Sequence, residues 1–78
     1  MTITIIGVNL QNREETSIEF QSILTTYGCK IRTRIGLHPS EQDICLNRGI
    51  VLLEVKGDAE DLIGALSKYW SIQTMTFE

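Results

Sequence analysis

Residues 48–70 of the chain carry the sequence RGIVLLEVKGDAEDLIGALSKYW, and this stretch decides the fold. Its first part, residues 49–56, predicts a strand, because apolar and β-branched side chains alternate between two faces there. One face carries Val51, Leu53 and Val55, and the other carries Ile50, Leu52, Glu54 and Lys56. The second face is apolar at one end and charged at the other, which predicts an interior strand whose far side is covered only in part.

The second part of the stretch predicts an amphipathic helix. Gly57 ends the strand, and Asp58 is suited to the N-cap because its carboxylate can accept hydrogen bonds from first-turn amides. Apolar residues then recur at helical spacing as one stripe: Ala59, Leu62, Ile63, Leu66, Tyr69 and Trp70. Gly64 costs about 1 kcal/mol relative to Ala in a helix interior, so we expect it to allow a close approach between helix and sheet.

The remaining segments supply partners for this unit. Residues 2–10 predict an interior strand with apolar residues on both faces, and Ser71–Phe77 predicts a last strand with Met75 and Phe77 inward. After the first of these strands, Asn12 is expected to begin a helix, and Glu15, three residues later, completes a capping box. The buried stripe of that helix consists of Thr16, Phe20, Ile23, Leu24 and Tyr27, followed by Gly28 as a left-handed C-cap residue.

Residues 29–37 alternate Ile31, Thr33 and Ile35 with Lys30, Arg32 and Arg34, which predicts an edge strand with one charged, wet face. The polar loop 38–43 follows. The order β-α-β-β-α-β then predicts a ferredoxin-like α+β fold, a four-stranded antiparallel sheet with two helices on one face. We expect a single domain over residues 1–78.

The uncovered face of that sheet predicts self-association. We expect Ile6, Val8, Ile50 and Leu52 to point toward it, more apolar surface than water accommodates well. A chain of 78 residues also builds only a small core. We therefore expect a homodimer or higher oligomer that pairs through the sheet.

Composition narrows the class of protein. With 42% hydrophobic and 22% charged residues the chain is an ordinary globular protein, and a net charge of -3 argues against nucleic-acid binding. The aliphatic run 50–53 is too short to span a membrane. The N-terminal residues lack the basic region of a signal peptide, and two cysteines are too few for a disulfide framework. We expect a cytoplasmic protein.

The sequence contains no phosphate-binding glycine motif, no H-E-x-x-H and no C-x-x-C, so we expect no enzyme. Cys29, His38 and Cys45 could meet as soft metal ligands or include a nucleophile, with two small structural thiols as the alternative. The row Lys30, Arg32 and Arg34 could hold an anionic ligand, with a solvated sheet edge as the alternative.

Three segments carry a resemblance to a known family: Asn12-Arg13-Glu14, Arg34-Ile35-Gly36 and the heptapeptide DLIGALS of residues 61–67. With them the chain resembles, over nearly its full length, the short ACT-like regulators of the iron-only hydrogenase system. The link 38–48 is longer here, and the link before the last strand is shorter. The single His does not reproduce the His-rich site of the related nickel-responsive regulator.

The resemblance implies a sensor that dimerises through its sheet and binds a small effector, often an amino acid, at a subunit interface. No DNA-binding helix-turn-helix is recognisable, so control of transcription would require a protein partner. Amides where the first strand meets the first helix could receive a carboxylate; this predicts a ligand site at Gly7, Val8, Asn9, Leu10, Gln11 and Asn12. The competing hypothesis is a metal or redox sensor that uses Cys29, His38 and Cys45.

Overall fold

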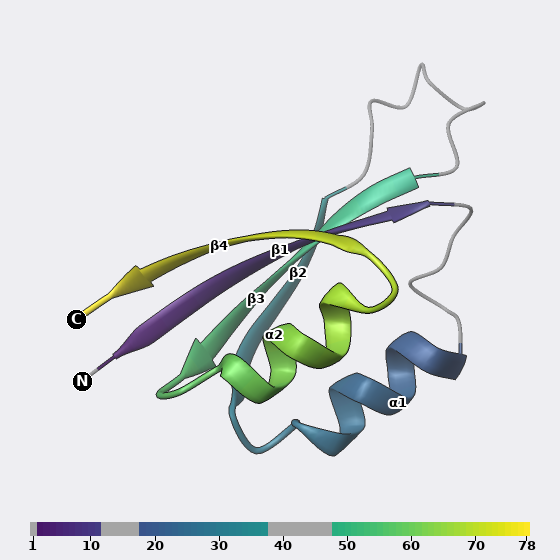
Figure 1. Cartoon of the computed structure of the whole chain (residues 1–78). Helices are drawn as coiled ribbons and strands as arrows, with labels where there is room; N and C mark the ends of the chain where they lie inside the picture. Colours follow the sequence, from purple (N-terminus) through teal and green to yellow (C-terminus); the bar gives the residue numbers. More distant parts are fainter. Residues whose placement is uncertain (1, 12–17, 38–47) are drawn as a thin grey trace.

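The computed structural model describes residues 2–11, 18–37 and 48–78 of the chain. The elements are β1 (Ile3–Gln11), α1 (Ile18–Thr26), β2 (Ile31–Leu37), β3 (Arg48–Lys56), α2 (Glu60–Ser67) and β4 (Ser71–Phe77). The strands form one antiparallel sheet in the order β2-β3-β1-β4, and both helices lie on one side of it (Figure 1). The predicted ferredoxin-like α+β fold is confirmed.

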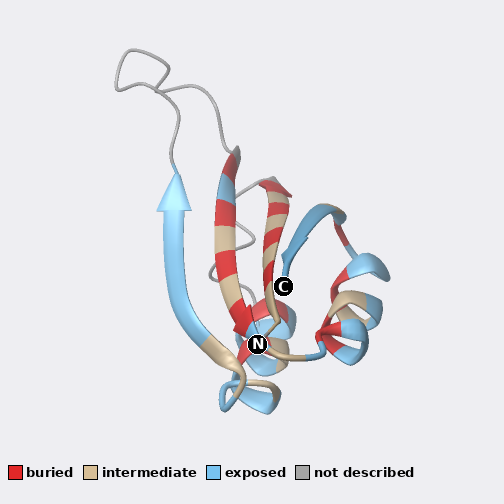
Figure 2. Ribbon diagram, turned by 90° about the vertical axis from the view of Figure 1, so that its left-hand side faces the viewer, coloured by how far each residue is buried: buried red, intermediate tan, exposed pale blue. Residues whose placement is uncertain are grey.

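Strand register divides the sheet into a helix face and an open face. Ile6 pairs with Leu53 and Val8 with Val51, and all four are buried under the helices. Buried and half-buried residues alternate along β1 and β3, as Figure 2 shows. The core on the helix face consists of Ile6, Val8, Leu10, Phe20, Leu24, Val51, Leu53, Val55, Ala59, Leu62, Leu66 and Trp70.

The expected face of β1 was wrong. Ile6 and Val8 lie in the core, and Gly7 and Asn9 take their place opposite Leu52 and Ile50 on the open face. Alternation fixes which side chains of one strand share a face, but the register with the neighbouring strand decides which face that is. Both faces of β1 are rich in apolar residues, so its own sequence left that choice open.

A β-bulge changes the alternation of β2. Ile31 pairs with Val55 and Thr33 with Glu54, so the register shifts by one residue between them. As a result Ile31 packs against the core, whereas Thr33, Ile35 and Leu37 lie on the open face opposite β3. The expected regular alternation of residues 29–37, with one charged face, is therefore wrong.

The turn into α2 has the predicted chemistry. Gly57 ends β3 with a φ of 79°, a conformation that residues with a Cβ adopt at a cost. The carboxylate of Asp58 accepts a hydrogen bond of 2.9 Å from the backbone N–H of Glu60. Asp58 thus serves one amide of the first turn, but the predicted N-cap position was wrong by one residue, because the N-cap is Ala59, which makes no side-chain capping bond.

The expectations for two other glycines were wrong. Gly64 is exposed, and a Cβ built on it would meet nothing within 4 Å, so no close helix–sheet approach requires glycine there. Gly28 is not left-handed, because Gly57 is the glycine with positive φ among the described residues. The chain leaves α1 through successive tight turns instead, with the N–H of Gly28 bonded to the carbonyl of Thr25 at 3.2 Å.

The last strand presents its largest apolar side chains to the open face. Met75 and Phe77 were expected inward, but they are 59% and 56% exposed. They are register partners of Ile5 and Ile3, so the outer end of β4 lies beside the start of β1. Tyr69 also departs from its predicted stripe and is exposed, while Trp70 is buried.

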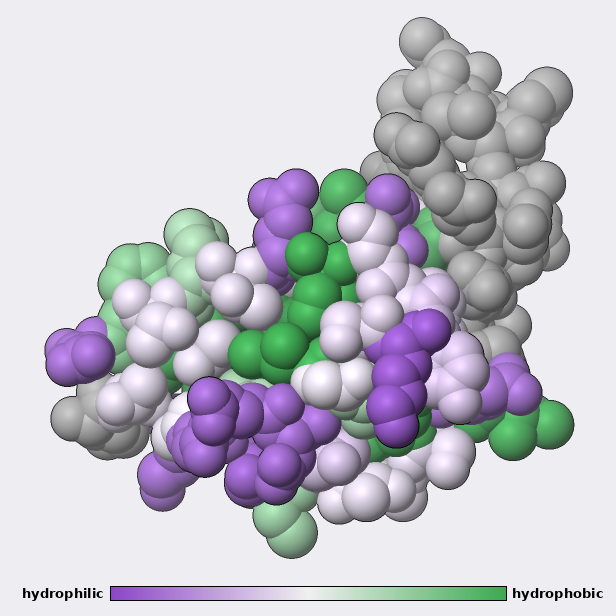
Figure 3. Space-filling model, in the orientation of Figure 1, coloured by the Kyte–Doolittle hydropathy of each residue, from purple (hydrophilic) through white to green (hydrophobic). Residues whose placement is uncertain are grey.

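Space-filling representation in the orientation of Figure 1 shows hydrophobic side chains in the middle of the face in view, with hydrophilic side chains around them (Figure 3). The exposed residues of α2 include Glu60 and Asp61 in its first turn, where negative charge suits the helix dipole. Its buried residues Leu62 and Leu66 point to the sheet. The second helical stripe is thus confirmed except at Tyr69.

Candidate ligand site on the open sheet face

The open face is apolar over much of its extent. Neither described helix covers it, and most of the large exposed hydrophobic side chains of the described residues belong to it: Ile35, Leu37, Ile50, Met75 and Phe77. They come from β2, β3 and β4, so the apolar surface crosses the width of the sheet. A patch of this kind on a small domain marks a binding surface.

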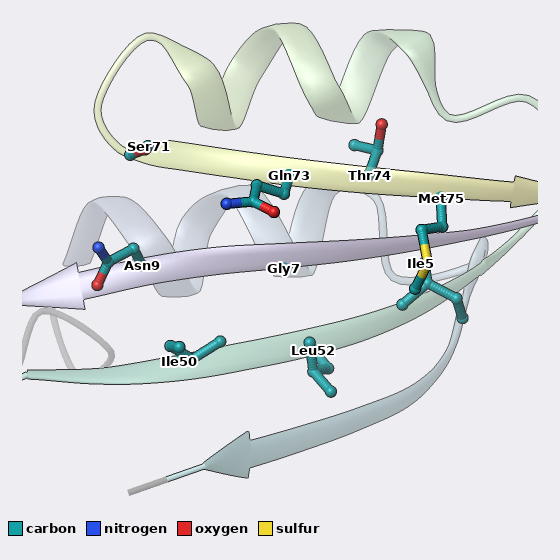
Figure 4. A pocket seen from close by; sticks show the side chains of 9 residues that line it. All are labelled: Ile5, Gly7, Asn9, Ile50, Leu52, Ser71, Gln73, Thr74 and Met75. Carbon is teal, nitrogen blue, oxygen red and sulfur yellow. The ribbon is translucent and has the colours of Figure 1, made fainter. Parts of the chain in front are cut away.

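Within this face lies a hollow of about 330 Å³ over β1, β3 and β4. Its lining consists of Ile5, Gly7, Asn9, Ile50, Leu52, Ser71, Gln73, Thr74 and Met75 (Figure 4). Gly7 lies in the central strand of the three and leaves the floor without a side chain. A Cβ at Gly7 would lie 3.5 Å from Cδ2 of Leu52 and 3.8 Å from the carbonyl oxygen of Gln73.

The hollow has an apolar end and a polar end. Ile5 and Met75 are register partners and lie close together at one end in Figure 4. Asn9 and Ser71 are register partners at the other end, where Ile50 lies beside Asn9 as its partner on β3. Gln73 lies on β4 between Ser71 and Met75, and the amide nitrogen of its side chain is directed toward Asn9. The described lining contains no charged side chain.

The side-chain oxygen Oδ1 of Asn9 is buried and has no hydrogen-bond partner in the described structure. A buried acceptor without a partner costs about 1–3 kcal/mol of stability. Such groups are rare in folded proteins and occur where a ligand or water completes the bonding. Asn9 is therefore the residue lining the hollow whose hydrogen-bonding capacity is incompletely used in the described structure.

Charge lies beside the hollow and not in it. Glu54 is the register partner of Ile5 on the open face. Its Oε1 accepts a hydrogen bond of 2.7 Å from the hydroxyl of Thr33, which fixes the carboxylate over β3. The apolar end of the hollow is thus flanked by a positioned negative charge.

The structure divides the predicted ligand segment. Gly7 and Asn9 line the hollow, whereas Val8 and Leu10 are buried on the helix face. The side chain of Gln11 and all of Asn12 lie outside the described residues. The polar residues that β4 adds, Ser71 and Gln73, were not predicted, because only the sheet order places them next to β1.

The predicted metal ligands stay a prediction. Cys29 is exposed with a free thiol, while His38 and Cys45 lie outside the described residues. Within the described parts of the chain, no group of three or more His, Cys, Asp or Glu residues is placed to hold a metal ion.

The basic row does not form one surface. The Nζ of Lys30 donates to the carbonyl oxygen of Asp58 at 3.1 Å. The guanidinium of Arg34 lies over the ring of Phe20, on the opposite side of the sheet from Thr33 and Ile35. The β-bulge separates these two cations, so the row cannot hold one anion as the strict alternation suggested.

Comparison with known proteins supports the fold. No protein-family model matches the chain, and no curated protein matches it. The crystal structure of a formyltetrahydrofolate deformylase from Pseudomonas putida KT2440 matches with a TM-score of 0.57 at 12% sequence identity. The match covers 97% of this chain and 28% of that protein.

The likeness defines the fold class of this chain as ACT-like and ferredoxin-like. Neither helix of the described residues is long and apolar enough to cross a membrane.

Proposed function

We propose that this chain is a small regulatory binding module that works through its open sheet face, without a catalytic step. Two copies pair through that face, and a small effector binds in the hollow at their interface. The observation that carries the proposal is an amphipathic hollow within an apolar sheet face that no described helix covers.

The dimensions of the face support a second copy as its occupant. Strands of seven to nine residues, spaced about 4.8 Å apart, give a surface of roughly 20 by 25 Å. Side-chain relief raises its accessible area toward the roughly 800 Å² that each partner buries in a stable complex. A self-complementary patch of Ile35, Ile50 and Phe77 suits a two-fold interface, in which both subunits use the same surface.

The oligomeric state tests this proposal. Ile35 is half exposed on the open face and lies outside the hollow, so Ile35→Lys places a charge in the interface without changing the ligand site. Ile18→Lys is the matched control, since Ile18 is 83% exposed on α1. Light scattering at micromolar concentration is expected to give a dimer for the parent and for Ile18→Lys, and a monomer for Ile35→Lys. A monomeric parent protein would refute pairing through this face.

The regulated process is proposed from the family resemblance. The segments Arg34-Ile35-Gly36 and DLIGALS support a regulator of the iron-only hydrogenase system that passes its signal to a protein partner. In a host with such a hydrogenase, loss of the chain is expected to change hydrogenase activity. Ile18→Lys should restore the original level and Ile35→Lys should not. Unchanged activity after loss of the chain would contradict this assignment.

A further inference from the structure

The lining of the hollow points to a particular chemistry of ligand. We propose that its effector is a compact, uncharged molecule with a hydrogen-bonding amide-like group at one end and a branched aliphatic group at the other. This inference rests on the proposed function and specifies the ligand class of the same site.

The polar end requires a ligand that donates a hydrogen bond. The Oδ1 of Asn9 has neither a partner nor access to solvent in the described structure, so rotation of this side chain into the hollow would let a ligand N–H or O–H bond to it. The side-chain amide of Gln73 and the hydroxyl of Ser71 lie at the same end and can donate as well as accept. A primary amide, which has both N–H donors and a carbonyl acceptor, matches these three groups.

The apolar end requires a hydrocarbon group. Its lining consists of the side chains of Ile5, Leu52 and Met75. Because Gly7 has no side chain, the hollow is deeper between its two ends. A volume of about 330 Å³ holds a ligand of metabolite size. Met75 is unbranched and adapts its shape to an aliphatic guest.

The charge pattern selects against ionised ligands. The described lining offers no counter-ion for a carboxylate, and a charge taken from water without a partner is strongly disfavoured. Glu54, which accepts a hydrogen bond from Thr33 beside the apolar end, disfavours the reverse orientation with a carboxylate at that end. The neutral amide of a short aliphatic acid should therefore bind, and the acid itself should bind much more weakly.

A matched pair of probes tests the ligand class. 4-Methylpentanamide and 4-methylpentanoate differ in the charge of the polar end and share the same aliphatic group. In a titration followed by backbone amide NMR shifts, the amide is expected to give saturable shifts at Gly7, Asn9 and Gln73 in the millimolar range. The carboxylate should bind at least tenfold more weakly. Absence of saturable shifts with the amide, or equal binding of the carboxylate, would overturn the inference.

Two variants assign the ends of the hollow. Asn9→Leu removes the buried acceptor that has no partner, so it should raise the melting temperature while weakening amide binding at least tenfold. In Gly7→Ala the added Cβ makes only ordinary van der Waals contacts, so the variant should fold normally. Because the methyl group fills part of the hollow, the variant should bind the amide more weakly. Ile18→Lys, on α1 and outside the lining, is the control that should retain binding. Full amide binding by both Asn9→Leu and Gly7→Ala would place the ligand elsewhere.

The tests separate this inference from the proposed function. If Ile35→Lys abolishes the dimer but the amide does not bind, the ligand class is wrong and the binding module stands. If the parent is a monomer and yet binds the amide through Asn9, pairing is wrong and the ligand class stands.

Discussion

The guanidinium of Arg34 lies 5.5 Å from the centroid of the Phe20 ring, and this contact joins the edge strand β2 to helix α1. Phe20 in turn meets Trp70 edge-to-face, with ring centroids 5.3 Å apart and an interplanar angle of 84°. A cation thus covers one side of an aromatic pair that connects α1 to the turn between α2 and β4. The arrangement gives Arg34 a packing role in place of the anion-binding role considered from the sequence.

Replacing Arg34 tests that role. Arg34→Gln removes the cation and is expected to lower the free energy of unfolding by about 0.5–1 kcal/mol, the usual size of a cation–π contact at an exposed site. Arg32→Gln removes the same charge from the exposed bulge and should change stability less. Urea unfolding of both variants measures the difference. Equal losses would mean that net charge, and not the ring contact, is responsible.

Gly64→Ala should stabilise the protein. The added Cβ meets nothing within 4 Å, so the gain in helix propensity, up to about 1 kcal/mol, is not opposed by a clash. The urea midpoint is expected to rise at an unchanged slope. A lower midpoint would instead support the close helix–sheet approach that the sequence suggested.

Gly57→Ala should have the opposite sign, although its Cβ also meets nothing within 4 Å. Its φ of 79° places an L-residue in the left-handed region, at a cost of about 1–2 kcal/mol. Gly57→Asn should lose less, since Asn tolerates this region better than other side chains. Thermal unfolding of the two variants checks the order, and equal stability of Gly57→Ala and the parent would contradict it.

Asp58→Ala should destabilise α2. The change removes the carboxylate that accepts from the N–H of Glu60 at 2.9 Å, and loss of such an acceptor at a helix start costs about 0.5–2 kcal/mol. Asp58→Asn keeps a side-chain acceptor and is the matched control. Chemical unfolding should therefore give Asp58→Asn a free energy of unfolding between those of Asp58→Ala and the parent. An Asp58→Ala variant as stable as the parent would show that water replaces the acceptor fully.

The sequence predicted the elements well because their signals are local. Alternation along residues 49–56, the helical stripe ending at Trp70 and the turn at Gly57 and Asp58 each follow from a few neighbouring residues. The choice of face for β1 and β2 was not local. It depends on pairing with β3, and the extra residue in the bulge near Arg32 reverses the pattern at the start of β2.

The site was predictable only in part for the same reason. Gly7 and Asn9 were in the predicted ligand segment and do line the hollow. Ser71 and Gln73 were not foreseen, because nothing within residues 71–77 indicates that β4 lies beside β1. Gly64 was misjudged because helix propensity identifies an unfavourable residue but carries no information on the space around it.

The pairing of Ile3 with Phe77 has a consequence for how this domain can be joined to other sequences. The first and last strands of the described chain end side by side, as the N and C marks in Figure 1 show. A linker of a few residues could close the chain there, and a circular permutant opened in the turn at residues 27–30 should keep the same sheet order. The same proximity means that a host protein could carry the domain within one of its surface loops, with little separation between the points of entry and exit.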